Sequence, residues 1–408
     1  MTSSEHNATA SRPRSEAGPR VGVLLWKHEH GPADISGMPW SMREALARAG
    51  CQVTPLLIDG RPKTHGGLRS RGWDRLVACA RDGYDRFFAA RVQDRLEASA
   101  RELARRVQSA VSGVEIDAVF APLMSHALAF YGGDPPVIYA TDSTASLLGE
   151  TYAPYRPGGA GRRSAEAELE TRAIACAARV VVPTEFVRRS AIEDHGAAPD
   201  RVAVVPMGAA RELGPAAALA PSPPRRDDLR LLLVAKDPER KRLGLSVEVT
   251  RELRRRGWAA TLHYVGPKRP ECALPEVCWA GYLSKSDPGD VGELQVLLRD
   301  CHIALLPSVA EMFGIATVES AAYSRPAVVS DAGGLPTVVL DHESGRVVPT
   351  DSAPSVWADA VESVAADPSR YADYGLAARA RFERTLNWDA WGRATRAVIE
   401  QVLQPARR

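Results

Sequence analysis

The chain has 408 residues, which is long enough for two domains of ordinary size. Hydrophobic residues make up 45% of it and charged residues 25%, as is usual in globular proteins. A formal net charge of +2 argues against a protein that binds nucleic acid or an anionic membrane through its overall charge. No stretch approaches ~20 consecutive apolar residues, so the sequence predicts no transmembrane helix.

The N-terminal segment and the cysteines both favour a cytoplasmic location. Residues 1–19 are polar, lack the apolar run of a signal peptide and predict a disordered tail. The six cysteines are scattered, and Cys272 and Cys278 lie six apart across a proline, which matches no usual zinc spacing. We therefore expect reduced thiols and no bound metal.

The first half of the chain is predicted to alternate between strands and helices. Apolar runs at 21–26 and 53–58 predict buried strands, and a helix is expected between them at 39–49. This βαβ unit indicates the α/β class with a right-handed crossover. A long helical region follows at 73–112. Further strands are expected at 118–122, 137–140, 179–183 and 201–205, with helices at 165–177 and 185–194.

A stretch rich in alanine and proline separates this half from a second βα series. Residues 209–228 lack hydrophobic periodicity, which is typical of an interdomain linker. Strands are then predicted at 231–235, 260–265, 277–280, 302–307, 327–330 and 345–348. We expect two doubly wound domains, 20–208 and 229–387, whose strands end at a common cleft, where ligands of open parallel sheets bind.

Two glutamates give the strongest chemical signal, between a strand that ends at Pro307 and a helix that begins near Ile315. Glu311 lies in the loop and Glu319 in the helix, so the two carboxylates can reach opposite ends of one ligand. The alternative is a pair of solvated acids stabilised by the helix dipole. Apolar residues flank Glu319 on both sides, however, and a buried acid needs a specific partner.

A basic cluster directly follows the first strand of the second half. Lys236, Arg240 and Lys241 lie close together, and two of the chain's six lysines are among them. A charge run after a strand is usually a solvated turn. Because lysine is so scarce in this chain, we favour a functional role for the cluster.

These motifs resemble, in their order and spacing, those of the retaining GT-B glycosyltransferases of the family-4-like group. The two glutamates are similar to that family's Glu-x7-Glu motif, and the resemblance extends from about Val21 to Trp388. Other segments that match are 35–42 (a glycine loop), 182–186, 205–208, 280–285, 331–334 and 387–388. The resemblance implies two Rossmann-like domains facing across a cleft, with the C-terminal helix 388–408 crossing back to complete the first.

The resemblance also implies a role for each charged residue. Glu319 would hold the ribose hydroxyls of a nucleotide-sugar donor, and Glu311 would hold hydroxyls of the transferred sugar. Lys241 would neutralise the diphosphate leaving group, because cleavage of the C–O bond leaves negative charge on the β-phosphate. Either Arg240 or Lys236 would supply the second cation.

The sequence departs from the family's pattern at three positions. Ala235 and Arg242 stand where glycine is usual, which leaves the choice of second cation open. Many relatives have histidine where Asp142 falls, at the end of an N-terminal strand. Asp142 is a candidate to stabilise the cationic sugar or to orient the acceptor. The alternative is an Asx turn or helix N-cap, with Ser143 and Thr144 following.

The remaining candidates are backbone groups, aromatic residues and histidines. His126 follows a strand and is a candidate for the acceptor side or simply a residue at a helix start, and Trp40 is a second acceptor candidate. His28 and His30 are expected to be loop residues, and loop 61–72 is expected to be solvated surface rather than a lid. The other expected donor-binding residues are Gly37, Tyr282, Leu283, Phe313, Gly314, Ile315 and Ala316.

The sequence thus predicts a hexosyltransferase-like enzyme that uses a UDP- or GDP-linked sugar and transfers it with retention by a front-face route. It contains no Asp-x-Asp motif, so we expect no metal and no other cofactor. The expected acceptor is a small soluble molecule, for instance a secondary metabolite, with no nucleic-acid partner and no integral membrane association. The alternatives are a nucleotide-sugar epimerase or phosphorylase on the same fold, or a non-catalytic GT-B-like partner protein.

Overall fold

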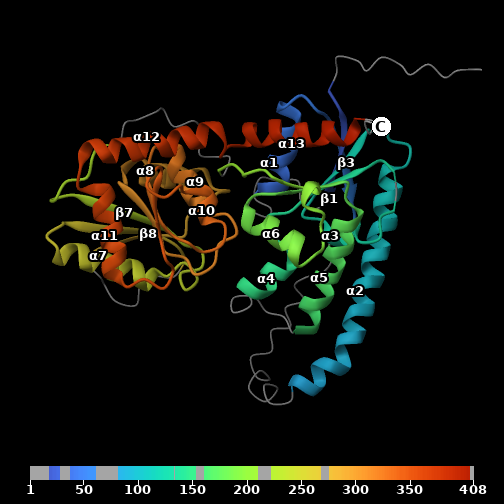
Figure 1. Cartoon of the computed structure of the whole chain (residues 1–408), viewed down its shortest axis with the longest axis horizontal. Helices are drawn as coiled ribbons and strands as arrows, with labels where there is room; N and C mark the ends of the chain where they lie inside the picture. The colour runs from blue at the N-terminus through green and yellow to red at the C-terminus, as the bar shows by residue number, and fades with distance from the viewer. Residues whose placement is uncertain are drawn as a thin grey trace, which may run out of the picture.

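The computed structural model describes residues 18–27, 37–60, 81–132, 134–152, 160–209, 222–267 and 275–404, with only the backbone described at 81–90 and 160–161. Two α/β units lie side by side along the long axis of the molecule (Figure 1). Several predictions concern residues outside the described part. These are most of the N-terminal tail, His28 and His30, the basic loop 61–72, Cys272 and most of the linker.

The first unit is built on a six-stranded sheet with the strand order β2-β1-β3-β4-β5-β6. All neighbouring strands are parallel. The strands are β1 (Arg20–Trp26), β2 (Gln52–Ile58), β3 (Ala118–Pro122), β4 (Val137–Ala140), β5 (Arg179–Val182) and β6 (Val202–Val204). The helices are α1 (Met38–Arg48), α2 (Arg81–Val111), α3 (Ser125–Leu128), α4 (Ala145–Thr151), α5 (Ala160–Cys176) and α6 (Glu185–Glu193).

The second unit has a six-stranded parallel sheet with the order β12-β11-β10-β7-β8-β9. Its strands are β7 (Leu229–Val234), β8 (Ala260–Val265), β9 (Val277–Gly281), β10 (Ile303–Leu306), β11 (Ala327–Ser330) and β12 (Gly345–Val348). The helices that follow β7 in the chain are α7 (Leu243–Arg255), α8 (Pro288–Asp300), α9 (Ile315–Ala322), α10 (Leu335–Val338), α11 (Pro354–Ala365), α12 (Pro368–Arg384) and α13 (Trp388–Leu403).

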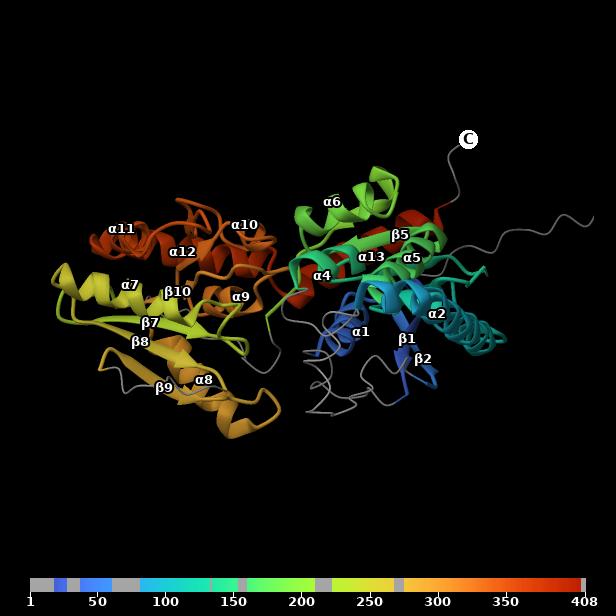
Figure 2. The same cartoon turned by 90° about the horizontal axis from the view of Figure 1, so that it is seen from below.

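The buried strands explain why the sheets were predictable. In β7, Leu231 packs in the same cluster as residues of α7 and α11, whereas Leu232 packs with α8 on the opposite face (Figure 2). Both faces of such a strand are covered, so its sequence is apolar throughout. Every predicted strand is confirmed within one or two residues. The sequence offers helix starts near His126 and Asp142 only as alternatives and predicts no bounds for α3, α4 and α10, because four to seven residues are too few for a periodic apolar pattern.

The last helix returns to the first unit. Helix α12 ends in the second unit, and α13 runs from there along α1 (Figure 1). A Cβ atom at Gly392 would lie 2.3 Å from the carbonyl oxygen of Ala45, so the two helices approach closely only because that residue is glycine. Arg396 donates a hydrogen bond of 2.7 Å to the carbonyl of Ala49. Trp391 is buried against Phe120 of β3.

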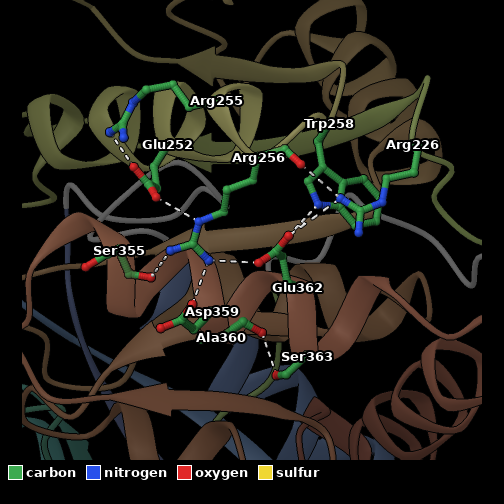
Figure 3. A network of polar contacts seen from close by, with 10 residues as sticks. All are labelled: Arg226, Glu252, Arg255, Arg256, Trp258, Ser355, Asp359, Ala360, Glu362 and Ser363. Carbon is green, nitrogen blue, oxygen red and sulfur yellow. Dashed lines mark hydrogen bonds and ion pairs between the residues drawn. The ribbon is translucent and has the colours of Figure 1, made fainter.

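A polar network joins α7 to α11 on the outer side of the second unit (Figure 3). The Arg256 guanidinium donates to Asp359 at 2.6 Å and to Glu362 at 2.8 Å. Glu362 also accepts a hydrogen bond of 2.8 Å from the indole of Trp258. The guanidinium of Arg226, just before β7, lies 4.2 Å from the centre of the Trp258 ring. Glu362 is therefore the shared acceptor of the network.

We predict that Glu362→Ala lowers the free energy of unfolding by about 1–3 kcal/mol, because the Trp258 indole loses its acceptor and Arg256 loses one of its acceptors. Urea denaturation followed by circular dichroism measures the change. Asp300→Ala is the control, since it removes an exposed carboxylate whose partner Arg299 is also exposed. Equal losses of stability in the two variants would contradict the structural role of the network.

Candidate functional site

The loop between β10 and α9 forms the centre of the candidate site. Gly314 precedes α9 with φ of 92°, and a Cβ atom there would lie 2.5 Å from a side-chain carbon of Leu335. Both facts favour glycine at this position. Ile315 and Ala316 begin the helix and remain partly exposed, whereas Phe313 is buried. The first N–H groups of a helix have no acceptor within it, so this exposed end can bind an anionic or hydroxyl oxygen.

Glu311 is buried in this loop between two cations. Its Oε1 lies 3.0 Å from Nη1 of Arg240 and 3.1 Å from Nζ of Lys241. The Glu311 side chain is 9% exposed and each basic side chain is 12% exposed. Burial opposes ionisation of the carboxyl, but Lys241 and then Arg240 outweigh it and hold the pKa of Glu311 below its usual value. These residues, 70 positions or so apart in sequence, form one charged cluster.

The structure favours Arg240 over Lys236 as the second cation. The Lys236 side chain is exposed, whereas Arg240 reaches Glu311 and also donates to the Ala310 carbonyl at 2.5 Å. Arg242 has φ of 53°, a left-handed conformation that glycine adopts at less cost. This explains why glycine is usual at that position in the family.

Glu319 lies inside α9 and is 1% exposed. One of its oxygens, Oε1, forms an ion pair with Lys285 from the loop between β9 and α8. The other, Oε2, is buried and has no hydrogen-bond partner among the described residues. A buried carboxylate oxygen without a donor is costly, so it is suited to accept a hydrogen bond from a ligand. Sequence reasoning placed Lys285 in a motif but gave it no role.

Two glycines support the Glu311 loop from the side of β11. A Cβ atom at Gly333 would lie 2.0 Å from the Glu311 carbonyl oxygen, and one at Gly334 would lie 2.0 Å from that of Met312. The N–H of Gly334 donates to the Glu311 carbonyl at 2.9 Å. The pair therefore fixes the backbone of the loop that carries the catalytic candidate.

Asp142 lies between β4 and α4 in the first unit. It is half-buried, and its charge helps to raise the pKa of Tyr152, although burial of that phenol and Glu311 contribute more. Thr144, and not Asp142, caps α4, since its hydroxyl accepts a hydrogen bond of 3.2 Å from the N–H of Leu147. Thr144 is therefore the N-cap of this helix, and Asp142 does not have that role.

Tyr152 is a site residue that sequence reasoning missed. It caps the C-terminus of α4, and its hydroxyl lies 3.4 Å from Nη1 of Arg240 in the second unit. The Arg240 guanidinium carbon is 5.0 Å from the centre of the Tyr152 ring. Burial, followed by Glu311, raises the pKa of Tyr152 to about 12, so the phenol stays protonated. Its position after a seven-residue helix gives no sequence signal for this contact.

The other candidates lie around this centre. Tyr282 is 52% exposed, and its neighbour Leu283 packs on the cluster beneath α8. Gly37 has φ of 72° and precedes α1, in whose first turn Trp40 lies. His126 begins α3, and its buried Nε2 has no hydrogen-bond partner among the described residues. Burial lowers its pKa, so its imidazole is neutral at pH 7. The roles assigned to these five residues remain predictions.

The described part of the chain holds neither a candidate membrane span nor a candidate metal site. None of the helices there is long and apolar enough to cross a membrane. No group of three or more His, Cys, Asp or Glu side chains in that part of the chain could hold a metal ion.

The sequence matches two family models, which between them span most of the chain. Residues 40–212 match "Glycosyltransferase Family 4" and residues 228–367 match "Glycosyl transferases group 1". The D-inositol 3-phosphate glycosyltransferase of Kineococcus radiotolerans is 29% identical over 303 residues, which are 66% of this chain and 67% of that protein. The alpha-maltose-1-phosphate synthase of Mycolicibacterium smegmatis is 32% identical over 115 residues, 27% of this chain and 30% of that protein.

Solved structures share the arrangement of the two units. Sucrose-phosphate synthase from Thermosynechococcus elongatus superposes with a TM-score of 0.63 at 16% identity, covering 94% of this chain and 99% of that chain. Anabaena HepE, solved in complex with UDP and glucose, superposes with a TM-score of 0.58 at 14% identity, covering 94% and 100%. At such identities the likeness shows the fold alone. With the two family matches, it establishes that the chain is a glycosyltransferase of the family-4-like group with the GT-B fold.

Proposed function

We propose that this glycosyltransferase takes a sugar from a UDP- or GDP-linked donor and transfers it with retention of configuration, without a metal ion. The observation that carries the proposal is the cluster of Arg240, Glu311 and Lys241 beside the start of α9. It places two cations next to exposed backbone amides at the carboxyl edge of a parallel sheet, where ligands of such sheets bind. The complex of Anabaena HepE with UDP and glucose supports a nucleotide-sugar donor.

The two cations suit a diphosphate leaving group. Cleavage of the bond between the sugar and the β-phosphate leaves negative charge on the phosphate oxygen. Arg240 and Lys241 are largely removed from water, so their charges act on that oxygen with little screening. Glu311 pairs with both of them, and these ion pairs fix the position of the two cations for the diphosphate.

The two glutamates take different parts of the donor. The unpartnered Oε2 of Glu319 accepts a hydrogen bond from a ribose hydroxyl. Glu311, beside the cations that receive the leaving group, holds hydroxyls of the transferred sugar. In the front-face route the departing phosphate and the entering acceptor share one face of the sugar. No carboxylate then has to act as a covalent nucleophile, unlike in retaining glycosidases.

The acceptor is proposed to be a small soluble metabolite that binds on the side of the first unit. The names of two relatives support a small molecule, since they refer to D-inositol 3-phosphate and to alpha-maltose-1-phosphate. Tyr152 of the first unit contacts Arg240 of the charged cluster, and the charge of Asp142 acts on Tyr152. Closure of the two units would exclude water and suppress hydrolysis of the donor.

We predict that Lys241→Ala lowers kcat at saturating donor by about 10²–10³-fold, the range for losing one group that stabilises charge in the transition state. Arg240→Ala should have an effect of similar size, whereas exposed Lys236 should be tolerant of the same change. Initial rates of nucleoside-diphosphate release measure all three variants. Full activity of Lys241→Ala would rule out its role at the leaving group.

A second prediction separates the two glutamates, once thermal shifts with UDP, GDP, ADP and TDP have identified the nucleotide. Glu319→Ala should mainly weaken binding of that nucleotide, because ribose contacts are equal in ground and transition states. Glu311→Ala should mainly lower kcat, because it lies nearest the reacting sugar. Calorimetric Kd values and kcat together test this, and reversed phenotypes would refute the division of roles.

The third prediction concerns metals. Activity should survive exhaustive treatment with EDTA, because Arg240 and Lys241 supply the positive charge that a divalent ion gives to other diphosphate sites. Rates before and after chelation are compared on one enzyme preparation. A fall of more than about tenfold that Mg²⁺ or Mn²⁺ restores would instead require a metal at the leaving group.

A further inference from the structure

Helix α4 of the first unit lies beside the charged cluster of Arg240, Glu311 and Lys241 in the second unit. Asp142 lies three residues before its first residue, Ala145, and Tyr152 directly follows its last. The Tyr152 hydroxyl touches Arg240, and the charges of both Glu311 and Asp142 act on that hydroxyl. Both ends of α4 therefore approach the same place, and the position of this short helix decides where the two side chains lie.

The start of α4 is anchored by Glu170 from α5. Both oxygens of the Glu170 carboxylate accept hydrogen bonds: Oε1 from the Tyr139 hydroxyl at 2.6 Å, and Oε2 from the backbone N–H of Ala145. Tyr139 lies in β4, three residues before Asp142. One buried carboxylate thus joins the strand that leads into the Asp142 loop to the first residue of the helix that leaves it.

Burying the Glu170 carboxyl at this position costs free energy. Its residue is 3% exposed, and no lysine, arginine or histidine forms an ion pair with it in the described part of the chain. The charged or titratable groups that act on it are Tyr139 from β4, Asp142 from the loop and Glu166 from its own helix. Burial raises the pKa of Glu170 to about 7, against the two hydrogen bonds, and both nearby carboxylates add to the rise.

A buried carboxyl with a raised pKa lowers the stability of the fold when it ionises. A gain in stability therefore does not explain why Glu170 stands at this position. Neither the donor nor the acceptor role proposed above uses it. A second set of contacts, in which the Thr144 hydroxyl lies 2.6 Å from that of Ser190, already supports the start of α4 from α6. What Glu170 adds is a fixed position for the backbone at Ala145, immediately next to the Asp142 loop.

We propose that Glu170 is a positioning residue of the transfer reaction: its carboxylate fixes the start of α4 and thereby sets where Asp142 and Tyr152 meet the Arg240–Glu311–Lys241 cluster. The inference rests on the proposed function, because it assigns Glu170 an effect on catalysis through Asp142 and Tyr152. In this proposal Glu170 does not contribute to binding of the donor, which is proposed to bind to the second unit.

The main test is a double-mutant cycle. Glu170→Gln should lower kcat at saturating donor about tenfold or more, since small displacements of reacting groups have effects of this size. Asp142→Asn should also lower kcat about tenfold. Because Glu170 acts through the Asp142 loop, the double variant should lose no more than the larger single loss. Binding of UDP or GDP, whichever stabilises the wild-type enzyme, should be unchanged in all three.

The second readout is thermal stability against pH. A raised folded-state pKa gives stability that is fully present below about pH 4.5 and is lost as the pH rises through about 7. Glutamine cannot ionise, and its single carboxamide oxygen cannot accept hydrogen bonds from both the Ala145 N–H and the Tyr139 hydroxyl as the two carboxylate oxygens do. The Tm of Glu170→Gln minus that of wild type should therefore increase from pH 5.5 to pH 8. A variant that is more stable at pH 8 yet less active is not expected of a merely structural residue.

Glu166→Gln is the matched control. Glu166 lies one turn earlier on α5, is partly exposed and pairs with Arg162 at 2.8 Å, so this variant should keep wild-type kcat. Should Glu170→Gln fail to fold, Tyr139→Phe removes one of the two donors to the same carboxylate and should lower kcat in the same way.

Three outcomes would each overturn the role of Glu170. The first is a double variant whose loss of kcat equals the product of the two single losses. The others are a Glu170→Gln variant that also loses nucleotide affinity, and a Glu170→Gln variant with the kcat of the wild type. The Lys241→Ala variant separates this failure from a wider one. If Lys241→Ala is impaired while Glu170→Gln is fully active, only the positioning role is wrong. If both are fully active, the proposed function is wrong as well.

Discussion

The site depends on one buried carboxylate shared by two cations. Glu311 by itself would be costly to bury, and so would Arg240 and Lys241, but together they bring a net positive charge to the cleft at moderate cost. The arrangement keeps the two basic side chains from folding back into solvent before a ligand is present. For the diphosphate donor that we propose, these charges would already be desolvated, and little reorganisation would be left for the moment of reaction.

The backbone of the surrounding loops holds the residues of this cluster in position. Gly333 and Gly334 let one loop lie directly against the carbonyls of another, and Gly314 turns the chain into α9 through a left-handed backbone conformation. Arg242 accepts a left-handed conformation just after Lys241. Strained backbone and close contacts thus occur in the loops at the carboxyl edge of the second sheet, around the charged cluster.

Much of this could be read from the sequence, because the signals are local. Apolar runs fixed the strands, and the spacing of Glu311 and Glu319 around a strand–helix junction pointed to the donor site. Tyr152, Glu170 and Lys285 gave no such signal. Their partners lie far along the chain: Tyr152 meets Arg240 88 residues later, and Lys285 meets Glu319 34 residues later. Only the packed fold shows such pairs, and a short helix such as α4 has too few residues for its pattern to be recognised.

The return of α13 to the first unit has a topological consequence. The chain crosses between the units twice, once before β7 and once between α12 and α13, so two connections of the polypeptide backbone join the units. Two attachments leave fewer directions of relative motion than one, which favours opening and closing about a single axis over free tumbling. The same route means that no single cut separates the units, because the first would lose Trp391 and Gly392 from its packing. The second unit is contiguous in sequence, but the first is assembled from two segments of the polypeptide that lie on either side of it in the sequence.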